Sequence, residues 1–188
     1  MILDLQTQVY KEETVAYDDT PLSPHWIYKR FGISGSALVA FRGPADVPIE
    51  HMVDLEDVKN IAPIYSPDML HFLGEFFIDS LDAGILLQHH LVACLYESLW
   101  EKGTRYLSRR GNDLFFDGRK LSVSIATKSP VSVLVHLGIN VDTKGTPLPT
   151  AGLAEIWLDP WEIATQVLEK FRVDAQTWKK ARVKVLPR

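Results

Sequence analysis

Two stretches of the sequence concentrate residues able to hold an anion or a small polar ligand. The first, residues 102–128, contains two acids, Asp113 and Asp117, and seven basic residues. The basic residues are Lys102, Arg105, Arg109, Arg110, Arg119, Lys120 and Lys128. The second, residues 134–142, places His136 and Asn140 within a branched apolar run. Clustered cations predict an anion site, and a solvated charged surface is the alternative that stays open.

The first half of the chain contains a further group of candidate functional residues, made of acids and histidines. His51, Asp54, Glu56 and Asp57 crowd into one segment, while His71 and Glu75 lie four apart in an expected strand. Residues two or four apart in a strand share one face. Carboxylates and imidazoles together suit a divalent metal or acid–base catalysis. His51, Asp54, His71 and Glu75 are therefore weak metal-ligand candidates, with solvated loop acids as the alternative.

The order of two motifs resembles the catalytic core of biotin protein ligases. Residues 109–121 read Arg-Arg-Gly-Asn-Asp-Leu-Phe-Phe-Asp-Gly-Arg-Lys-Leu, and residues 134–142 read Leu-Val-His-Leu-Gly-Ile-Asn-Val-Asp. In those ligases an Asn-Asp-Leu strand, a Gly-(Arg/Lys)-Lys-Leu strand and a Gly-Ile-Asn-Val strand follow one another, and lipoate protein ligases are similar over the first part. With the preceding helix the resemblance covers about sixty residues. The whole chain is also identified as a member of domain family of unknown function 366, which resembles a divergent branch of this ligase fold.

The resemblance implies a small-molecule ligand and roles for particular residues. Activating a carboxylic acid with ATP brings two anions together, so a fixed cation must bridge them. Lys120 matches the ligase lysine that does this, which makes it the catalytic candidate. The expected ligand-binding residues are Arg110, Asn112, Asp113, Arg119, Ser122, Ser124, His136 and Asn140. ATP and Mg²⁺ are the cofactors that the resemblance implies, whereas the residues alone leave the cofactor unknown.

One departure from the ligase pattern keeps other functions open. The Arg/Gly-rich loop that closes over the acyl-adenylate in these ligases has no counterpart here, since Gly32-Ile33-Ser34-Gly35-Ser36 contains no arginine. A binding or assembly module that kept the fold and lost the reaction is therefore the second hypothesis. A metal-dependent hydrolase using the His51, Asp54, His71 and Glu75 cluster is the third.

Hydrophobic periodicity and turn residues predict the elements that must position these groups. Leu87, Leu91, Leu95 and Leu99 predict a helix over residues 82–102 that ends at Gly103. Asp117-Gly118 predicts a hairpin turn between strands at 113–116 and 120–126. Further strands are expected within 2–17 and at 36–41, 69–78, 105–107 and 131–141, and further helices at 23–32, 159–172 and 174–182, whereas residues 48–63 are irregular. We expect an α+β fold, a mostly antiparallel sheet flanked by helices, which by resemblance is biotin/lipoate protein ligase-like and class II aminoacyl-tRNA synthetase-like.

Length and composition narrow the remaining possibilities. The 188 residues fit one domain, 1–188, and the single cysteine, Cys94, excludes an intrachain disulfide. A net charge of -4 and an acidic first half disfavour nucleic acid as a partner. The N-terminal residues lack the pattern of a signal peptide and no apolar run is long enough to span a bilayer, so we expect a cytoplasmic protein that does not bind membranes. The resemblance also implies a homodimer or higher homo-oligomer.

Overall fold

Two sheets, both mostly antiparallel, form the framework of the protein. The computed structural model describes residues 4–61, 63–146 and 148–186. The larger sheet has the strand order β1-β2-β3-β8-β7, in which only β1 and β2 pair in parallel. Its strands are β1 (Gln6–Val9), β2 (Ala37–Val47), β3 (Ile64–Phe76), β7 (Ser122–Lys128) and β8 (Val133–Asp142). A smaller sheet pairs β4 (Leu107–Arg110), β5 (Asp113–Phe116) and β6 (Arg119–Lys120). The predicted mostly antiparallel α+β architecture is confirmed.

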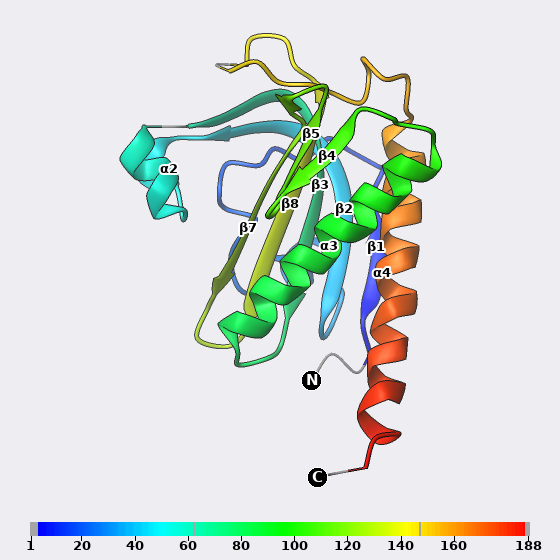
Figure 1. The fold of residues 1–188 in the computed structure, drawn as a ribbon. Coiled ribbons are helices and arrows are strands. Elements are labelled where there is room, and N and C mark those ends of the chain that lie inside the picture. The colour runs from blue at the N-terminus through cyan, green and yellow to red at the C-terminus, as the bar shows by residue number, and fades with distance from the viewer. Residues whose placement is uncertain (1–3, 62, 147, 187–188) are drawn as a thin grey trace.

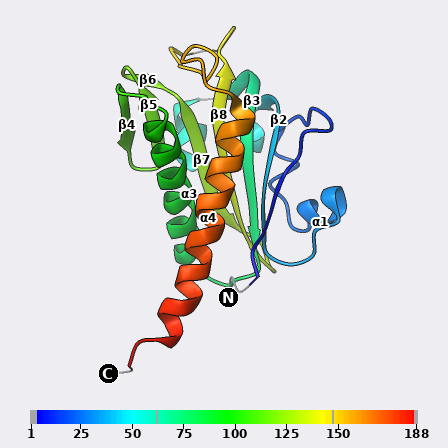
Figure 2. The same ribbon diagram turned by 90° about the vertical axis from the view of Figure 1, so that its right-hand side faces the viewer.

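Two long helices cover one face of the larger sheet. Figures 1 and 2 show α3 (Leu81–Glu101) and α4 (Pro160–Val183) packed side by side on this face. Alternate strand residues point toward them and form one buried cluster with the helices. This cluster includes Leu70, Phe72 and Phe76 of β3, Val133, Val135, Leu137 and Ile139 of β8, and Leu91, Leu95, Leu99, Val167 and Phe171 of the helices. Burial of each large side chain contributes about 1.5–3 kcal/mol, so this cluster holds the fold together.

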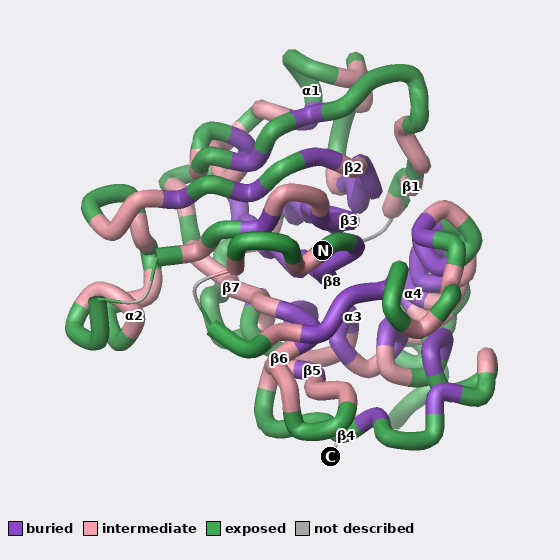
Figure 3. Tube along the Cα trace, turned by 90° about the horizontal axis from the view of Figure 1, so that it is seen from above, coloured by how far each residue is buried: buried purple, intermediate pink, exposed green. Residues whose placement is uncertain are grey.

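The opposite face of the sheet is only partly covered. The short helix α1 (Trp26–Phe31) and the segment before it pack on β2 and β3 through Tyr17, Ile27, Phe41 and Leu73. Figure 3 shows α1 and α4 on opposite sides of the sheet. The connection between β2 and β3 forms a 3-10 turn, η1 (Ile49–His51), and α2 (Leu55–Asn60), which Figure 1 shows beyond β7. This arrangement leaves a hollow between α2, β7 and β8.

The predicted helix boundaries needed two corrections. α1 begins at Trp26 after His25, which adopts a left-handed conformation and makes no side-chain cap, so the predicted start of this helix at residue 23 was wrong, whereas its end at Gly32 agrees with the prediction. The helices expected at 159–172 and 174–182 form the single helix α4, and Asp174 lies inside it. No glycine or proline interrupts residues 172–176. A continuous helix also buries both Phe171 and Ala175, which favours continuity over a break.

The strand boundaries differ where the chain changes sheets or bulges. The strand expected at 120–126 is divided at Leu121, whose N–H bonds to Leu114 of the small sheet while its carbonyl accepts from Asn140 of β8. β2 continues past Pro44 to Val47 through a register shift, because a bulge accommodates a proline that has no N–H. The segment expected within 2–17 contains β1 and a bridge at Tyr17, and its first residues, 2 and 3, lie outside the described residues.

Gly43, at the β2 bulge, is expected to tolerate no side chain. A Cβ built there would lie 2.1 Å from the backbone oxygen of Val15, and backbone atoms cannot rotate away. We expect Gly43→Ala to lower the free energy of unfolding by about 3 kcal/mol, the upper part of the usual overpacking range. Gly111→Ala is the matched control, because its Cβ would meet nothing within 4 Å and only its positive φ adds strain. Urea unfolding that ranks the two variants equally would contradict this prediction.

Candidate functional site

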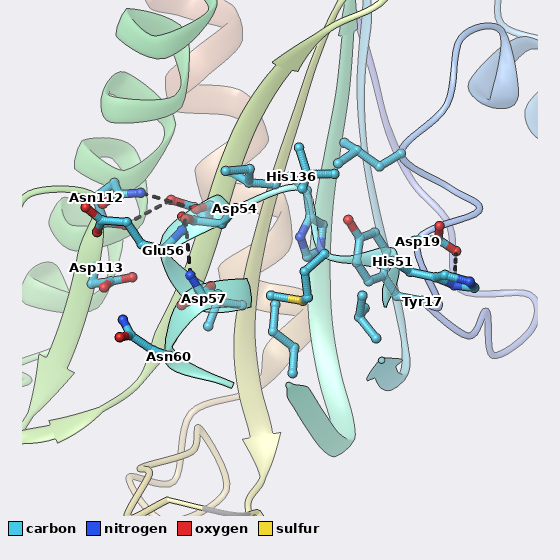
Figure 4. A pocket seen from close by; sticks show the side chains of 18 of the residues that line it. Tyr17, Asp19, His51, Asp54, Glu56, Asp57, Asn60, Asn112, Asp113 and His136 are labelled. Carbon is cyan, nitrogen blue, oxygen red and sulfur yellow. Dashed lines mark hydrogen bonds and ion pairs between the residues drawn. The ribbon is translucent and has the colours of Figure 1, made fainter. Parts of the chain in front are cut away.

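A pocket of about 220 Å³ opens on the face of the sheet opposite α3 and α4. Its floor is mostly apolar and comes from the larger sheet and from Met52, which directly follows η1; the apolar residues are Val47, Met52, Ile64, Val123 and Ile125. Its rim is polar and comes from two elements far apart in sequence, α2 and the small sheet (Figure 4). The residues of the rim are Asp54, Glu56, Asp57 and Asn60 on one side and Asn112, Asp113 and Lys120 on the other.

Among the described lysines and arginines, Lys120 is the one that lines this pocket. Its Nζ lies 3.0 Å from Oδ2 of Asp113 across the hairpin, whose Asp117-Gly118 turn has positive φ at both residues, as the sequence predicted. The carbonyl of Lys120 accepts from Ala151 N at 2.9 Å, so its backbone is held on both sides. Both charged side chains remain partly exposed, and an incoming anion can therefore compete with Asp113 for Lys120.

Asn112 and Ser124 fasten the small sheet to the larger one beside the pocket. Asn112 Nδ2 donates to the carbonyl of Ser124 at 3.2 Å, and Ser124 Oγ donates to the carbonyl of Asn112 at 3.0 Å. Gln88 of α3 donates to Ser124 Oγ at 2.8 Å, which fixes this hydroxyl from behind. Ser124 and Asn112 both line the pocket, but Ser124 Oγ and Asn112 Nδ2 already have hydrogen-bond partners. Their main effect is to hold the neighbouring Asp113 and Lys120 in place.

Four predicted ligand-binding residues lie outside the lining of this pocket. Ser122 is buried and accepts from Leu114 N at 2.9 Å, and Asn140 Nδ2 donates to the carbonyl of Ala151 at 3.3 Å. The Arg119 guanidinium pairs with Glu155, and the Arg110 guanidinium lies 4.8 Å from the centre of the Phe115 ring. These four residues shape the sheets around the pocket, whereas Lys120, Asn112, Asp113, Ser124 and His136 line it.

The acids of α2 face Lys120 across the pocket. Asp54 caps α2, since its Oδ1 accepts from Glu56 N at 2.8 Å and from Asp57 N at 3.4 Å. Partial burial and the charge of Asp54 raise the pKa of Asp57, and the charge of Lys120 partly offsets that rise. The rim therefore carries more negative than positive charge, and a cation brought in with a ligand would relieve the repulsion.

Two buried histidines form a hydrogen-bonded chain that ends at the pocket floor. His71 Nε2 lies 3.1 Å from the carbonyl oxygen of Gly43, and His71 Nδ1 lies 3.0 Å from His136 Nε2. A carbonyl only accepts, so His71 carries its proton on Nε2 and its Nδ1 must accept from the N–H of His136. Burial lowers the pKa of His71 to about 4 and that of His136 well below its usual value, so both rings are neutral at pH 7.

This chain of bonds leaves His136 Nδ1 as an unprotonated acceptor. His136 lines the pocket, and its ring stacks on Tyr17 with 3.8 Å between ring centres (Figure 4). Among the described residues, none forms a hydrogen bond with His136 Nδ1, and the His136 ring, although almost fully buried, is one of the groups that line the pocket. A ligand group with an N–H or O–H has an acceptor at the floor.

The four weak metal-ligand candidates do not converge. His51 pairs with Asp19, Asp54 caps α2, and His71 belongs to the histidine pair. Glu75 does share the face of β3 with His71, but it accepts from His25 N at 2.9 Å and from Ser132 Oγ at 2.8 Å. Among the described residues these four form no group whose ligand atoms lie within 4.8 Å of one another. The geometry that the hydrolase hypothesis requires is absent from this part of the chain.

Some lining residues had no recognisable signal in the sequence. Tyr17, Asp19 and Asn60 reach the pocket because the segment before α1 and the β2–β3 connection fold back over the sheet. The sequence shows that the acids of residues 54–57 form a cluster, but the position of this cluster opposite Lys120 depends on long-range strand pairing. Local sequence patterns do not encode such a pairing.

The chain matches the family described as domain of unknown function (DUF366) over residues 6–186, and it belongs to this family. An uncharacterized protein of Methanocaldococcus jannaschii, MJ0805, is 37% identical over 142 residues, which span 73% of this chain and 64% of that relative. A protein of unknown function from Pyrococcus horikoshi has a solved structure with a TM-score of 0.93 and 38% identity, covering 98% of this chain and 100% of that one.

Solved ligases share the fold at lower sequence identity. A biotin protein ligase from Aquifex aeolicus in complex with biotin has a TM-score of 0.60 and 18% identity, covering 96% of this chain and 73% of that one. A lipoate-protein ligase A bound with ATP has a TM-score of 0.56 and 13% identity, covering 88% of this chain and 84% of that one. The predicted biotin/lipoate protein ligase-like fold is confirmed. None of the described helices is both long and apolar enough to cross a membrane.

Proposed function

We propose that the pocket at Lys120 binds a small carboxylic acid or its nucleotide adduct, an acyl-adenylate. The observation that carries this proposal is the pairing of one cation, Lys120, with an apolar floor in a single hollow of the sheet. The floor suits an acyl chain or a base, and the cation suits a carboxylate or a phosphate. The bound ligands of the two ligases with this fold, biotin and ATP, belong to the same chemical classes.

The acids of the rim suit a ligand that arrives with a divalent cation. Mg²⁺ is usually held by one or two carboxylates together with substrate phosphates and water, rather than by a closed protein cage. Asp54, Asp57 and Asp113 supply such oxygens around the pocket without converging on one point. A nucleotide with Mg²⁺ therefore fits this donor set, and the ion would neutralise part of the charge that faces Lys120.

His136 adds a requirement on the ligand at the floor. Its Nδ1 lone pair, which has no hydrogen-bond partner among the described residues, favours a ligand with an N–H or O–H group near the carboxylate or base. A ligand without a donor would leave this nitrogen desolvated and unpaired, which costs about 1–3 kcal/mol for a buried polar group. The proposed ligand class is thus a carboxylate or adenylate that carries a donor on its buried side.

A binding module without ligase activity is the second candidate. The observation that favours it is the absence of arginine from the described lining of the pocket, where Lys120 alone supplies positive charge. Adenylate formation concentrates negative charge in the transition state, and preorganised donors are the usual means of stabilising it. Binding requires fewer such groups than catalysis does.

Thermal unfolding with ligands tests the proposal. The ligands are ATP with Mg²⁺, AMP, biotin, lipoate, octanoate and a non-hydrolysable acyl-adenylate mimic. We expect the mimic to raise the midpoint of the wild type, because a ligand at a hundredfold excess over its Kd stabilises the native state by about 2.7 kcal/mol. Lys120→Ala should lose this shift, whereas its own midpoint should change little, since exposed ion pairs contribute about 0–1 kcal/mol.

Arg119→Ala is the matched control. Arg119 is the neighbour of Lys120 in β6, but it pairs with Glu155 outside the pocket, so the ligand shift should persist. No shift with any ligand, or an equal loss in both variants, would contradict the proposed site. Exchange of labelled pyrophosphate into ATP then separates the two candidates, because it requires adenylate formation and binding alone does not produce it.

A further inference from the structure

A second group of side chains with metal-ligating chemistry lies between α3 and α4, away from the pocket. His90 and Cys94 are one turn apart on α3, and Asp174 faces them from α4. His90 Nε2 lies 3.0 Å from Asp174 Oδ2 and 3.5 Å from Cys94 Sγ. The three ligand atoms all lie within 4.8 Å of one another. Residues four apart on a helix share one face, so the local geometry follows from the His-x-x-x-Cys spacing.

The surroundings hold these side chains in place while leaving one side open. The His90 ring packs 4.9 Å from the Trp178 ring and 5.4 Å from the Phe171 ring, measured between ring centres. Cys94 is buried with a relative exposure of 1%, whereas the side chains of His90 and Asp174 are 29% and 43% exposed. The group therefore has a closed wall on the sulfur side and access from solvent on the carboxylate side.

We propose that His90, Cys94 and Asp174 bind a zinc-class divalent metal ion that clamps α3 to α4. Zinc takes thiolate, imidazole and carboxylate ligands at about 2.0–2.3 Å in a tetrahedron, which places its ligand atoms about 3.3–3.8 Å apart. The separations of 3.0 and 3.5 Å from His90 lie close to that spacing, and Cys94 Sγ and the Asp174 oxygen, which lie within 4.8 Å of each other, would approach it when the ion binds. The fourth position faces solvent and would hold water.

The charges around the group also favour a cation. Cys94 and Asp174 can supply two negative charges, and Glu97 lies on the same side of α3. Lys170 opposes them, and its Nζ lies 2.8 Å from Glu101 and 4.0 Å from Glu97, so part of its charge is already balanced. When the metal–sulfur bond forms, the Cys94 thiol releases its proton to solvent, and neutral His90 binds through the lone pair of Nε2 with its proton on Nδ1.

Titration of tag-free, chelator-treated protein with Co²⁺ and Zn²⁺ tests this site. We expect one Co²⁺ per chain with a thiolate-to-metal charge-transfer band and the intense visible bands of tetrahedral coordination, all displaced by Zn²⁺. Cys94→Ser should abolish the charge-transfer band. Cys94→Ser and Asp174→Asn should each raise the Kd at least about tenfold, since even residues that only support ligands contribute that much.

His89→Ala is the matched control, because His89 is adjacent on α3 but hydrogen-bonds to Arg109 instead. It should leave both the spectrum and the Kd unchanged. A Co²⁺ spectrum without the thiolate band, or affinities that are the same in wild type and Cys94→Ser, would overturn the proposal and leave a His90–Asp174 bond that tethers the helices. These results do not depend on ligand binding at Lys120, which lies on the other face of the sheet.

Discussion

Acidification from pH 6.5 to pH 4 is expected to lower the free energy of unfolding by about 3 kcal/mol through His71 alone. In the unfolded chain the pKa of His71 is at its usual 6.5, whereas burial lowers it to about 4 in the folded protein. Between these values the unfolded state binds more protons, so stability is fully present above pH 6.5 and falls as the pH drops. The slope for one such group approaches about 1.4 kcal/mol per pH unit.

His136 contributes with the same sign, because burial and the neighbouring His71 lower its pKa as well. Urea unfolding of wild type and His136→Gln at half-unit intervals from pH 7.5 to pH 4.5 measures its share. Glutamine can still donate to His71 Nδ1 but does not titrate, so the variant should show a slope smaller by up to about 1.4 kcal/mol per pH unit. His51→Gln, at the half-exposed side chain that pairs with Asp19, is the control. Equal slopes in wild type and His136→Gln would contradict the neutral pair.

The neutral histidine pair also bears on the proposed ligand. A protonated His136 would bring a second positive charge into the pocket and would donate from Nδ1 instead of accepting there. Since both pKa values lie below the usual one, the acceptor form persists at neutral pH. Under the proposed function, recognition at the floor would depend on the direction of the hydrogen bond to His136, and attraction of an anion would depend on Lys120.

Local sequence signals were sufficient for much of the fold. The repeat of Leu87, Leu91, Leu95 and Leu99 predicted α3 to within a residue at each end. The Asp-Gly turn predicted the β5–β6 hairpin because few residues other than glycine and aspartate accept positive φ in both turn positions. Both features are encoded within a few neighbouring residues, and tertiary contacts had little opportunity to override them.

Long-range effects account for the elements that were missed. The sequence predicts no helix at α2, because its one strong local signal is the cap at Asp54 and none of its own residues is buried. β2 was expected to end at Arg42-Gly43-Pro44, but pairing with β3 carries it through the bulge. In each case a partner distant in sequence determines the outcome.

The same distinction applies to the candidate site. Asn112, Asp113 and Lys120 lie within nine consecutive residues, so their motif identified one side of the pocket. The role of Ser122 and Asn140 in holding backbone groups follows from the crossing between the two sheets, which no local pattern shows. The motifs therefore contain residues that hold the two sheets together as well as residues that line the pocket.

Phe171→Ala is expected to destabilise the protein by about 3–5 kcal/mol, as a large-to-small change in a closed core does. Phe171 is fully buried, and its ring lies 6.0 Å from Phe76 of β3 and 5.7 Å from Trp178 between ring centres. It therefore joins α4 to the sheet at the level where the sequence predicted a break between two helices. Chemical denaturation monitored by far-ultraviolet circular dichroism measures the loss.

Phe77→Ala provides the same chemical change just beyond the end of β3, where the side chain is 37% exposed, and should cost about 1 kcal/mol or less. If Phe171→Ala cost no more than this control, α4 would not be anchored to the sheet through its middle, which would contradict the prediction. A large decrease in the free energy of unfolding would show that the continuous helix α4 is held to the core through its middle. Because Asp174 lies one turn beyond Phe171, the position of Asp174 opposite His90 depends on that same continuity.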